Sequence, residues 1–450
     1  MASTVDRVVA ASWVVPVQPA GALADHAVAI AGGRIAAVLP AAEARQRYGA
    51  ARFEHYPGHV LMPGLVNLHT HAAMALMRGF ADDLPLMEWL HQHVWPAEGR
   101  HLSARFVADG TRLAAAEMLL GGVTTFNDMY FFPEAVGAAA VTAGIRVVAG
   151  LVAVEFPTRY APDANTALER GFATRADFAG EPLVQFALAP HAPYTVGDAL
   201  FQRMSRLARE EGMRLHCHVH ETATEVAEAL AASSERPLAR LARLGVLGPE
   251  FIGVHCVHLD ERDIQLLAAH GAHVAHCPTS NLKLASGFAP ATALVRAGVN
   301  VGLGTDSAAS NNRLDLFAEL RLAALLAKGQ SGDAAAWSAP TALRAGTLGG
   351  AEALGLAAEI GSLEAGKSAD LIAVDLSAPT LQPVFDPISH LAYVAGREQV
   401  REVWVAGVQR VHRGELVAGG PGGALSSADL SATAAEWAAR LADVAAHPVA

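Results

Sequence analysis

The chain has 450 residues, of which 52% are apolar and 17% are charged, and its net charge is −11. This length exceeds one simple domain, and the apolar content excludes an intrinsically disordered protein. Because the sequence has no basic run and no run of about 18 apolar residues, we expect neither a nucleic-acid partner nor a membrane span.

The first 63 residues are predicted to form strands rather than an export signal. Residues 1–17 are rich in valine but carry acidic and basic side chains, which favours a strand of a cytoplasmic protein over a signal peptide. Two short strands, His26–Ala31 and Arg34–Leu39, flank the dipeptide Gly32-Gly33, the pattern of a β-hairpin. Residues 1–63 are therefore expected to be the N-terminal part of a β-domain.

Residues 64–364 alternate apolar strands with helical stretches rich in alanine and leucine, for example Ala104–Leu120, Leu200–Glu211, Asp260–His270 and Ala289–Ala297. The sequence contains eight such strands: Val66–His71, Val123–Met129, Ile145–Ala153, Val184–His191, Arg214–Glu221, Phe251–His258, His273–Asn281 and Val299–Asp306. Eight β–α units predict a parallel sheet that is covered by helices and closed into a (β/α)8 TIM-like barrel, an α/β fold. In such barrels the active site lies at the C-terminal ends of the strands.

The C-terminal region returns to β-structure and then ends in a helix. Ala369–Asp375 and Glu402–Ala406 look like strands within the C-terminal part of the β-domain, residues 365–420. Two β-rich flanks around one barrel are expected to meet as one small β-sandwich domain built from both chain ends. Residues 421–450 are predicted to be a helical tail, in which apolar side chains follow helical spacing at Leu430, Trp437, Leu441 and Val444.

The most informative chemical feature is the pair His69 and His71 at the end of the first barrel strand. Side chains at i and i+2 of a strand point to the same side, so these two imidazoles can bind one metal ion. The pair alone is weak evidence, because two histidines also occur on one strand face as core residues. Further polar residues stand at or near the ends of later strands: Asp128, His191, His218, Glu221, His255, His258 and Asp306.

These strand ends contain a complete set of residues for a hydrolytic metal site. A metal ion that activates water needs neutral imidazoles and carboxylates as ligands, with one position left for the water. His69, His71, His218 and Asp306 can supply that set. Glu221 follows His218 by three residues, where the strand ends, so it can act as a general acid and base toward the water without being a ligand.

Eight segments, taken in chain order, carry a family resemblance: Pro63–His71, Leu76–Gly79, Glu88–Leu90, Pro190–Tyr194, His218–Thr222, His255–His258, Ser280–Leu284 and Gly304–Asn312. Through them the chain resembles the amidohydrolase superfamily, specifically the 5-methylthioadenosine/S-adenosylhomocysteine deaminases and their triazine-hydrolase relatives. The likeness runs from the N-terminal β-segment to about residue 415. Each segment is moderately specific, and all of them together in this order are highly specific.

The resemblance implies one divalent metal ion, zinc or else iron or another divalent ion, with the ligands His69, His71, His218 and Asp306. It implies Glu221 as the proton shuttle and His255 as the group that polarises the attacked carbon. Asp306 helps to move a proton to the leaving ammonia. Relatives with two metal ions bridge them through a lysine at the end of strand four, and Leu183–Leu200 contains no lysine, which favours a single ion.

By the same resemblance, His191 faces the substrate base, Glu98 binds the ribose hydroxyls and Trp89 stacks near the same end of the ligand. Relatives that accept S-adenosylhomocysteine well use arginines after strand three. Ala149–Leu151 supplies none of these arginines, which leaves Arg159 as the candidate. We therefore expect a hydrolytic deaminase of an adenine nucleoside, with 5′-methylthioadenosine preferred over S-adenosylhomocysteine and adenosine.

Two alternatives stay open at this point. The nearer one is a hydrolase or deaminase of a substituted triazine or of a free aminated heterocycle such as guanine. The more distant one is a non-catalytic scaffold, which would be expected to have lost metal ligands, and none is missing here. Relatives are often dimers or tetramers, so a homo-oligomer that binds only small molecules is compatible with the sequence.

The remaining polar and reactive residues are expected to be structural. His216 is expected deeper in the barrel than the metal site, and His220 at the pocket rim. Asp128 is expected to cap the segment that follows it, and Asp82 and Asp83 are expected in a solvated loop. The cysteines look like reduced core residues: Cys217, Cys256 and Cys277.

Overall fold

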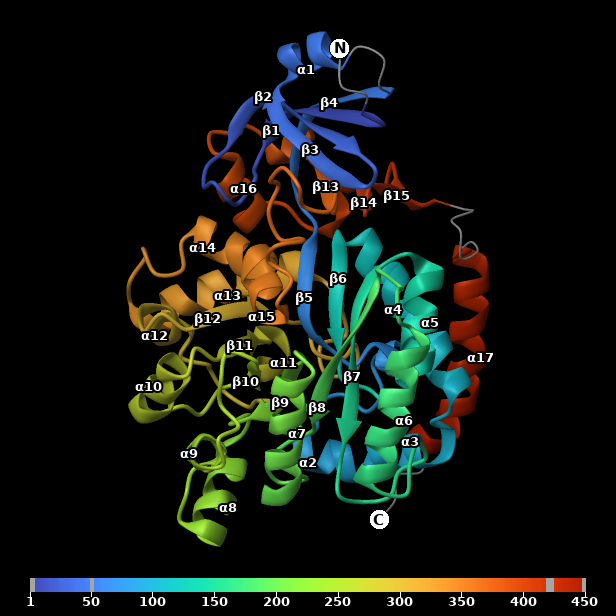
Figure 1. The fold of residues 1–450 in the computed structure, drawn as a ribbon, viewed down its shortest axis with the longest axis vertical. Coiled ribbons are helices and arrows are strands. Elements are labelled where there is room, and N and C mark those ends of the chain that lie inside the picture. Colours follow the sequence, from blue (N-terminus) through green and yellow to red (C-terminus); the bar gives the residue numbers. More distant parts are fainter. Residues whose placement is uncertain (1–4, 49–51, 418–424, 447–450) are drawn as a thin grey trace.

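The computed structural model describes residues 5–48, 52–417 and 425–446, and two eight-stranded sheets organise them (Figure 1). In one sheet the strands follow one another in chain order and pair in parallel. They are β5 (Leu65–Thr70), β6 (Val123–Asp128), β7 (Arg146–Ala153), β8 (Val184–Pro190), β9 (Arg214–Val219), β10 (Phe251–His255), β11 (His273–His276) and β12 (Asn300–Leu303). All eight predicted barrel strands are confirmed.

Several of these strands end earlier than predicted, because the backbone leaves the extended conformation where the polar residues begin. His220, His255 and Asp306 have φ angles of 56°, 69° and 62°. Residues with side chains enter this left-handed region only at an energetic cost, and it cannot continue a strand. The alternation of side chains therefore stops at His220 and His255, whereas β12 has already ended at Leu303, before Asp306.

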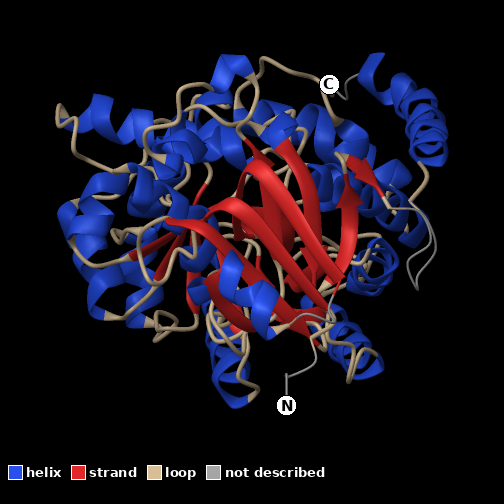
Figure 2. Cartoon of the chain, turned by 90° about the horizontal axis from the view of Figure 1, so that it is seen from above, coloured by secondary structure: helices blue, strands red, loops and turns tan. Residues whose placement is uncertain are grey.

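Helices surround the parallel sheet (Figure 2). The seam between β5 and the segment after β12 is held by the amide of Asp306, which donates to the carbonyl of His69 at 3.0 Å. The amide of Thr305 donates to Asn67 Oδ1 at 3.0 Å across the same seam. The covering helices include α4 (Ala104–Leu120), α5 (Pro133–Ala143), α6 (Ala164–Asp177), α7 (Asp198–Glu210), α8 (Ala223–Ser233), α9 (Pro237–Arg243), α10 (Glu261–Ala269), α11 (Pro278–Lys283), α12 (Ala291–Arg296), α13 (Leu316–Ser331), α14 (Ala339–Arg344) and α15 (Gly350–Leu354).

Side-chain caps explain where some of these helices begin. Ser103 Oγ accepts from the amide of Phe106 at 3.2 Å, so α4 begins at the residue that the sequence predicts. Before α10, the carboxylates of Asp260 and Asp263 each accept from the other residue's amide at 3.0 Å. Each cap satisfies an amide that the first turn of a helix leaves without an intrahelical partner.

The second sheet joins the two chain ends, in the order β16-β15-β14-β13-β4-β1-β2-β3. Its strands are β1 (Arg7–Val14), β2 (Leu23–Ala31), β3 (Arg34–Pro40), β4 (Arg52–Pro63), β13 (Leu371–Asp375), β14 (Val400–Val405), β15 (Val408–His412) and β16 (Glu415–Leu416). The antiparallel pair β4–β13, with Leu61 opposite Ala373, connects the N-terminal strands to the C-terminal ones. The predicted fold class, a barrel with a β-domain built from both ends, is confirmed.

A buried ion pair connects this β-domain to the barrel. Arg146, the first residue of β7, lies 3.3 Å from the carboxylate of Asp370, and both side chains are almost fully buried. Asp370 Oδ1 also accepts from the amide of Ala406 in the β-domain, at 2.7 Å. The fully buried Trp404 lies in the core of the same sheet, so the barrel rests on a well-packed base.

A segment between β5 and α4, residues 72–101, forms much of the pocket wall, and we call it the cover segment. It contains η1 (Ala72–Met77), α2 (Leu86–Trp89), η2 (Leu90–Val94) and α3 (Trp95–His101). Its helices α2 and α3 lie at the end of the barrel away from the β-domain (Figure 1). The terminal helix α17 (Ser427–Ala446) packs beside α4, where Trp437 Nε1 donates to Asp109 Oδ2 at 2.9 Å.

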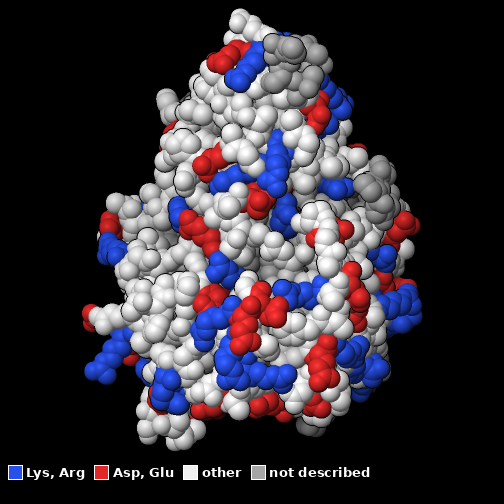
Figure 3. Space-filling view, in the orientation of Figure 1, with Lys and Arg blue, Asp and Glu red and all other residues white. Residues whose placement is uncertain are grey.

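Acidic and basic side chains are interspersed on the face shown in Figure 3. Charged side chains of the described residues form many ion pairs, such as Arg344 with Glu352 at 2.6 Å and Arg209 with Glu250 at 2.7 Å. Exposed pairs of this kind contribute little to stability. Among the described residues, none of the helices has both the length and the apolar character that crossing a membrane requires.

Candidate active site

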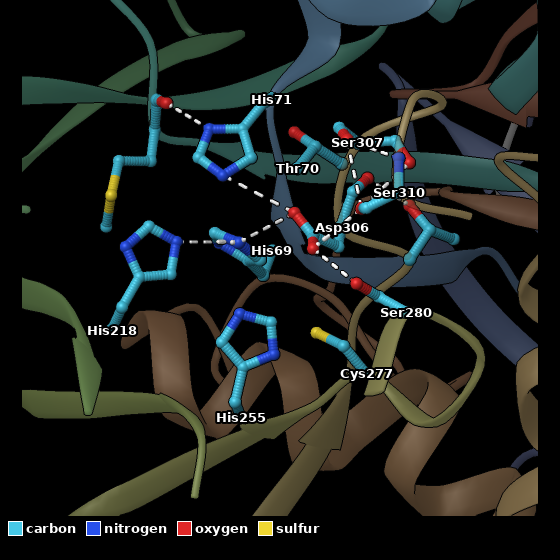
Figure 4. Close-up of polar contacts among 12 residues, drawn as sticks. His69, Thr70, His71, His218, His255, Cys277, Ser280, Asp306, Ser307 and Ser310 are labelled. Carbon is cyan, nitrogen blue, oxygen red and sulfur yellow. Dashed lines mark hydrogen bonds and ion pairs between the residues drawn. The ribbon is translucent and has the colours of Figure 1, made fainter. Parts of the chain in front are cut away.

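The structure brings the four predicted metal ligands together at the C-terminal ends of the barrel strands (Figure 4). His69 and His71 come from the end of β5, His218 from β9, and Asp306 from the turn after β12. His69 Nε2 and His71 Nε2 lie 3.3 Å and 3.4 Å from Asp306 Oδ1. His218 Nε2 lies 3.3 Å from His69 Nε2. The four ligand atoms therefore form one cluster around His69 Nε2, which lies 3.3 Å from both Asp306 Oδ1 and His218 Nε2.

The far side of two of these rings is fixed by backbone carbonyls. His71 Nδ1 lies 2.6 Å from the carbonyl oxygen of Met129, and His218 Nδ1 lies 2.8 Å from that of His191. A carbonyl can only accept, so each Nδ1 carries the proton and donates it. The lone pair of each Nε2 is then free for a cation.

The other two ligands have buried side-chain partners. His69 Nδ1 lies 3.1 Å from Nε2 of His216, which is fully buried beneath it, as expected for a histidine deeper in the barrel. Asp306 Oδ2 accepts from Ser280 Oγ at 2.7 Å and from Ser310 Oγ at 2.8 Å, leaving Oδ1 toward the histidines. These contacts hold each ligand in one orientation.

The electrostatics of this cluster suit a divalent cation. Burial lowers the pKa of His69 to about 4 and that of His218 well below its usual value, so both rings are neutral. Burial raises the pKa of Asp306, but the hydrogen bond with His69, and the charge that His69 carries in the acidic range where this carboxyl titrates, outweigh it and hold the pKa well below its usual value. Neutral imidazoles with an ionised carboxylate are a typical zinc-type ligand set, and the residues present fit one such ion.

His255, at the end of β10, lies beside this cluster and links it to Glu221. Two overlapping triads have ligand atoms within 4.8 Å of one another: one contains His69, His71 and Asp306, and the other contains His69, His218 and His255. His255 Nδ1 lies 2.8 Å from Asn281 Oδ1, and its Nε2 lies 3.7 Å from Glu221 Oε2.

Burial and charge act on His255 and Glu221 in different ways. Burial works against protonated His255, but the charges of Glu221 and Asp306 outweigh it and raise the pKa of His255. Burial raises the pKa of Glu221 above its usual value. The result is a neighbouring pair in which each group can hold or release a proton.

Glu225 is a residue of the site that the sequence analysis missed. Its two carboxylate oxygens accept from the amides of His220 at 2.9 Å and Glu221 at 2.7 Å, so it fixes the backbone that carries Glu221. Thr222 caps α8 by accepting from the amide of Glu225 at 3.1 Å. The spacing of Thr222 and Glu225 is that of a capping box, a signal that could have identified this residue.

The structure also tests the expected positions of two other residues, His220 and Asp128. The prediction that His220 lies at the pocket rim is wrong: it is fully buried, and its Nε2 accepts from the amide of Leu238 at 3.1 Å. Its left-handed backbone ends the strand alternation on which that prediction relied. Asp128 is structural, but it accepts from Thr70 Oγ1 at 2.9 Å and from the amide of Ala72 at 2.6 Å, so it holds the turn after β5.

The cysteines agree with their predicted role as reduced core residues. Cys217, Cys256 and Cys277 are all buried and none forms a disulfide. Burial raises the pKa of each thiol, so all three remain protonated. A protonated thiol is a poor metal ligand and a poor nucleophile.

A pocket of about 570 Å³ opens above the cluster, and His71, His218, Glu221, His255 and Asp306 line its floor. Most of the wall is apolar, formed by Met74, Leu86, Trp89, Leu90, Val94, Trp95, Leu102, Met129, Phe131, Val152, Val154, Phe156 and Pro157. A small polar floor below an apolar wall is the usual form of a site for a small organic ligand.

Glu98 and Trp89, two of the predicted substrate-binding residues, reach the pocket from the cover segment. Glu98 Oε1 accepts from the hydroxyl of Tyr130 at 2.7 Å, and burial raises the pKa of Glu98. Trp89 is fixed by its Nε1, which donates to the carbonyl of Phe80 at 3.1 Å. Tyr130 is a further lining residue that no sequence signal indicated, because only the fold brings it to Glu98.

The other two predicted substrate-binding residues, His191 and Arg159, also line the pocket. His191 Nδ1 lies 3.0 Å from Thr195 Oγ1, and burial lowers the pKa of His191 to about 3. Arg159 donates from Nε to the carbonyl of Leu102 at 2.9 Å and from Nη1 to that of Gly99 at 3.2 Å. All eleven roles assigned from the sequence therefore fall on residues that lie in or directly below one pocket.

Comparison with known proteins gives consistent results. The chain is 46% identical over 443 residues to a 5-methylthioadenosine/S-adenosylhomocysteine deaminase of Teredinibacter turnerae, and the match covers 98% of both chains. A solved adenosine deaminase of Xanthomonas campestris with bound zinc is 49% identical, with a TM-score of 0.95 over 98% of this chain and 100% of the other. The zinc complex of an atrazine chlorohydrolase of Arthrobacter aurescens has a TM-score of 0.85 at 24% identity, covering 98% and 100%, and shows a shared fold.

The resemblance found in the sequence motifs is thereby confirmed. Residues 60–410, which contain the barrel, the site and most of the C-terminal β-strands, match the amidohydrolase family. The matched region and the identity to the deaminase relatives both extend over most of the chain. The protein therefore belongs to the amidohydrolase family.

Proposed function

We propose that this protein is a metal-dependent hydrolytic deaminase, which replaces the 6-amino group of an adenine nucleoside by a 6-oxo group and releases ammonia. The observation that carries the proposal is the cluster of His69, His71, His218 and Asp306 beside Glu221 and His255, all of which except the fully buried His69 line one pocket. The names of relatives that are 43% to 46% identical over nearly the whole chain support it.

We propose zinc as the metal, because the 49%-identical deaminase of known structure is described with bound zinc. His69, His71, His218 and Asp306 would hold the ion. When bound, such an ion lowers the pKa of a water molecule and stabilises developing negative charge. The same four residues can also hold iron or another divalent ion, so zinc rests on the relative rather than on the ligand set.

The residues around the metal cluster then handle the protons. Glu221 accepts one from the attacking water and delivers it to a ring nitrogen of the base, and its raised pKa suits it to both steps. As the water oxygen bonds to the ring carbon, protonated His255 stabilises the charge that develops there. Asp306 helps to pass a second proton to the amino group, the carbon–nitrogen bond breaks, and ammonia leaves.

The substrate proposal rests on the pocket wall. Glu98 would offer a carboxylate to the ribose hydroxyls, and His191, which lines the same pocket, would contact the base. Beyond them the wall is mainly apolar, which suits a methylthio group better than a charged chain. Arg159 is the candidate partner of an amino-acid carboxylate. We therefore propose 5′-methylthioadenosine first, with S-adenosylhomocysteine and adenosine weaker.

The test is ammonia release from the zinc-loaded protein, with 5′-methylthioadenosine, S-adenosylhomocysteine, adenosine, guanine and an aminotriazine compared side by side. We expect fast turnover of 5′-methylthioadenosine and slower turnover of S-adenosylhomocysteine and adenosine. We expect no turnover of guanine or the aminotriazine. Glu221→Gln should reduce turnover by about 10²–10⁴-fold while the metal stays bound. Turnover of only guanine or the triazine would refute the nucleoside pocket but keep the metal chemistry.

A further inference from the structure

Lys283 belongs to one of the segments that carry the family resemblance, yet the proposed chemistry gives it no role. It is the last residue of α11, and its side chain is 19% exposed. Its ammonium group contacts Asp82 Oδ1 at 2.6 Å, the carbonyl of Ala309 at 2.8 Å and Asn312 Oδ1. All three N–H groups of the ammonium are therefore engaged.

The carboxylate of Asp82 completes this cluster. Its second oxygen accepts from Asn312 Nδ2 at 2.7 Å. Partial burial raises the pKa of Asp82, but the hydrogen bonds from Lys283 and Asn312 outweigh it and lower the pKa. Asp82 lies in the expected loop and is partly exposed, but it also forms an ion pair, which the sequence did not predict, with a lysine 201 positions away.

The cluster joins three segments that each reach the active site. Asp82 belongs to the cover segment, which brings Trp89 and Glu98 to the pocket. Ala309 and Asn312 belong to the loop that begins with the ligand Asp306. Lys283 ends the helix whose Ser280 donates to Asp306 Oδ2 at 2.7 Å.

A second contact supports the same connection. Arg78, also in the cover segment, donates to the carbonyl of Asn312 and pairs with Glu117 of α4. Glu117 Oε1 in turn accepts from the amide of Leu314 at 3.2 Å. The cover segment is thus attached to the 306–314 loop at two points, and Lys283 is the cation of the more buried one.

We propose that Lys283 is a positioning residue, which fixes the cover segment against the metal-ligand loop and so sets the distance between Glu98 and the metal cluster. The identity of the nucleoside substrate rests on the proposed function. The positioning role of Lys283 does not depend on it. An exposed ion pair would contribute little here. Lys283 differs because one ammonium serves acceptors on two separate segments, with little access to water.

The first experiment measures amide hydrogen exchange in the ligand-free, metal-loaded protein, comparing Lys283→Met with the unchanged chain. The expected result is faster exchange in residues 79–101 and unchanged exchange in β5 and β9. Lys328→Met is the matched control, because Lys328 likewise donates to two carbonyls, of Ala334 at 2.8 Å and Ala336 at 2.7 Å, away from the pocket. Unchanged exchange in residues 79–101 would overturn the proposal, whatever the substrate proves to be.

The second experiment separates substrate binding from chemistry. With 5′-methylthioadenosine, Lys283→Met should raise KM about tenfold while kcat changes less than about threefold and the metal content stays the same. Asp82→Asn should raise KM less, and the double variant should resemble Lys283→Met alone, because both changes break one contact. Loss of metal and of kcat at unchanged KM would overturn the proposal, since Lys283 would then support only the metal-ligand loop. If ammonia is not released at all, the proposed function fails, and the exchange result still decides the role of Lys283.

Discussion

The metal cluster on the pocket floor and the predicted nucleoside contacts on its wall are built from different parts of the chain. His69, His71 and His218 come from the ends of strands β5 and β9, and each has a second partner on its other ring nitrogen. Glu98 comes from the cover segment and Arg159 from the loop after β7, and both contact their neighbours mainly through tertiary hydrogen bonds.

This difference separates chemistry from specificity. The strand ends are placed by the barrel itself, so the positions of the ligands follow from the shared fold. The cover segment and the loop after β7 are additions to that frame, and a change in either one alters the wall without moving the ligands. We expect substitutions on the floor to abolish turnover and substitutions on the wall to redistribute it among substrates.

The largest effect should follow removal of a floor ligand. His218→Ala leaves the cluster with one ring nitrogen fewer, so we expect loss of most of the bound metal and a fall in ammonia release on the order of a thousandfold or more. Metal analysis and the ammonia assay check both results. His270→Ala, a change at an exposed histidine, should alter neither. Full metal content in His218→Ala would show that the floor does not depend on this ligand.

A wall substitution should act on binding instead. Glu98→Gln keeps the size of the side chain but removes the charged acceptor for the ribose hydroxyls. We expect KM for 5′-methylthioadenosine to rise about ten- to hundredfold, as for the loss of a hydrogen bond to a charged group, with the metal content unchanged. Steady-state kinetics measure this effect. An unchanged KM for nucleosides would remove Glu98 from the ribose site.

A smaller effect is expected at Arg159, whose Nη2 is not used by the two carbonyl contacts. Arg159→Met should reduce kcat/KM for S-adenosylhomocysteine about tenfold more than for 5′-methylthioadenosine, because only the former has a carboxylate to pair. Arg296→Met, which breaks an exposed pair with Asp333, is the control. An equal loss for both substrates would mean that Arg159 only supports the carbonyls of α3.

We expect the smallest effect on activity at Glu225, beneath the floor. A substitution there should change mainly the stability of the protein. Burial raises the pKa of Glu225 from 4.5 to about 7. The folded chain therefore binds this proton more tightly than the unfolded chain, and the stabilisation present at low pH is lost as the pH rises from about 4.5 through 7. The loss amounts to roughly 3 kcal/mol at most.

Urea unfolding of the metal-loaded protein between pH 4.5 and 8.5 tests this expectation. Glu225→Gln should lack that part of the decline in the free energy of unfolding, because glutamine does not titrate. Glu228→Gln, a change at an exposed position of the same helix, should keep the full decline. If the Glu225→Gln and Glu228→Gln curves run parallel, burial does not hold a proton on Glu225.

Much of the floor could be predicted from the sequence, because it follows local rules. His69 and His71 obey the i, i+2 alternation of a strand, and His218 and Asp306 lie at or just after strand ends, where barrels place their active sites. The strands themselves follow from apolar runs. Their early ends could not be predicted, since the left-handed backbone at His255 and Asp306 depends on the surrounding fold.

The wall and the supporting contacts were harder to predict, since they join residues far apart in the sequence. Tyr130 meets Glu98, and Lys283 meets Asp82, only because the barrel brings their segments together. Asp82 and Asp83 lie in a short segment with no periodic pattern, so the sequence predicts a loop but not the ion pair between Asp82 and Lys283. His220 was misplaced for a related reason, as strand alternation was extended past the point where the strand ends.

The sheet that joins both chain ends also sets an order of events during synthesis. Strand β4 ends at Pro63 and its partner β13 begins at Leu371, so about 300 residues must be made between them. At ~5–20 residues per second, the edge of β4 stays without its partner for roughly 15–60 s. An unpaired strand edge is a template for wrong pairing. We therefore expect the free edge of β4 to need protection from wrong pairing until β13 has been translated.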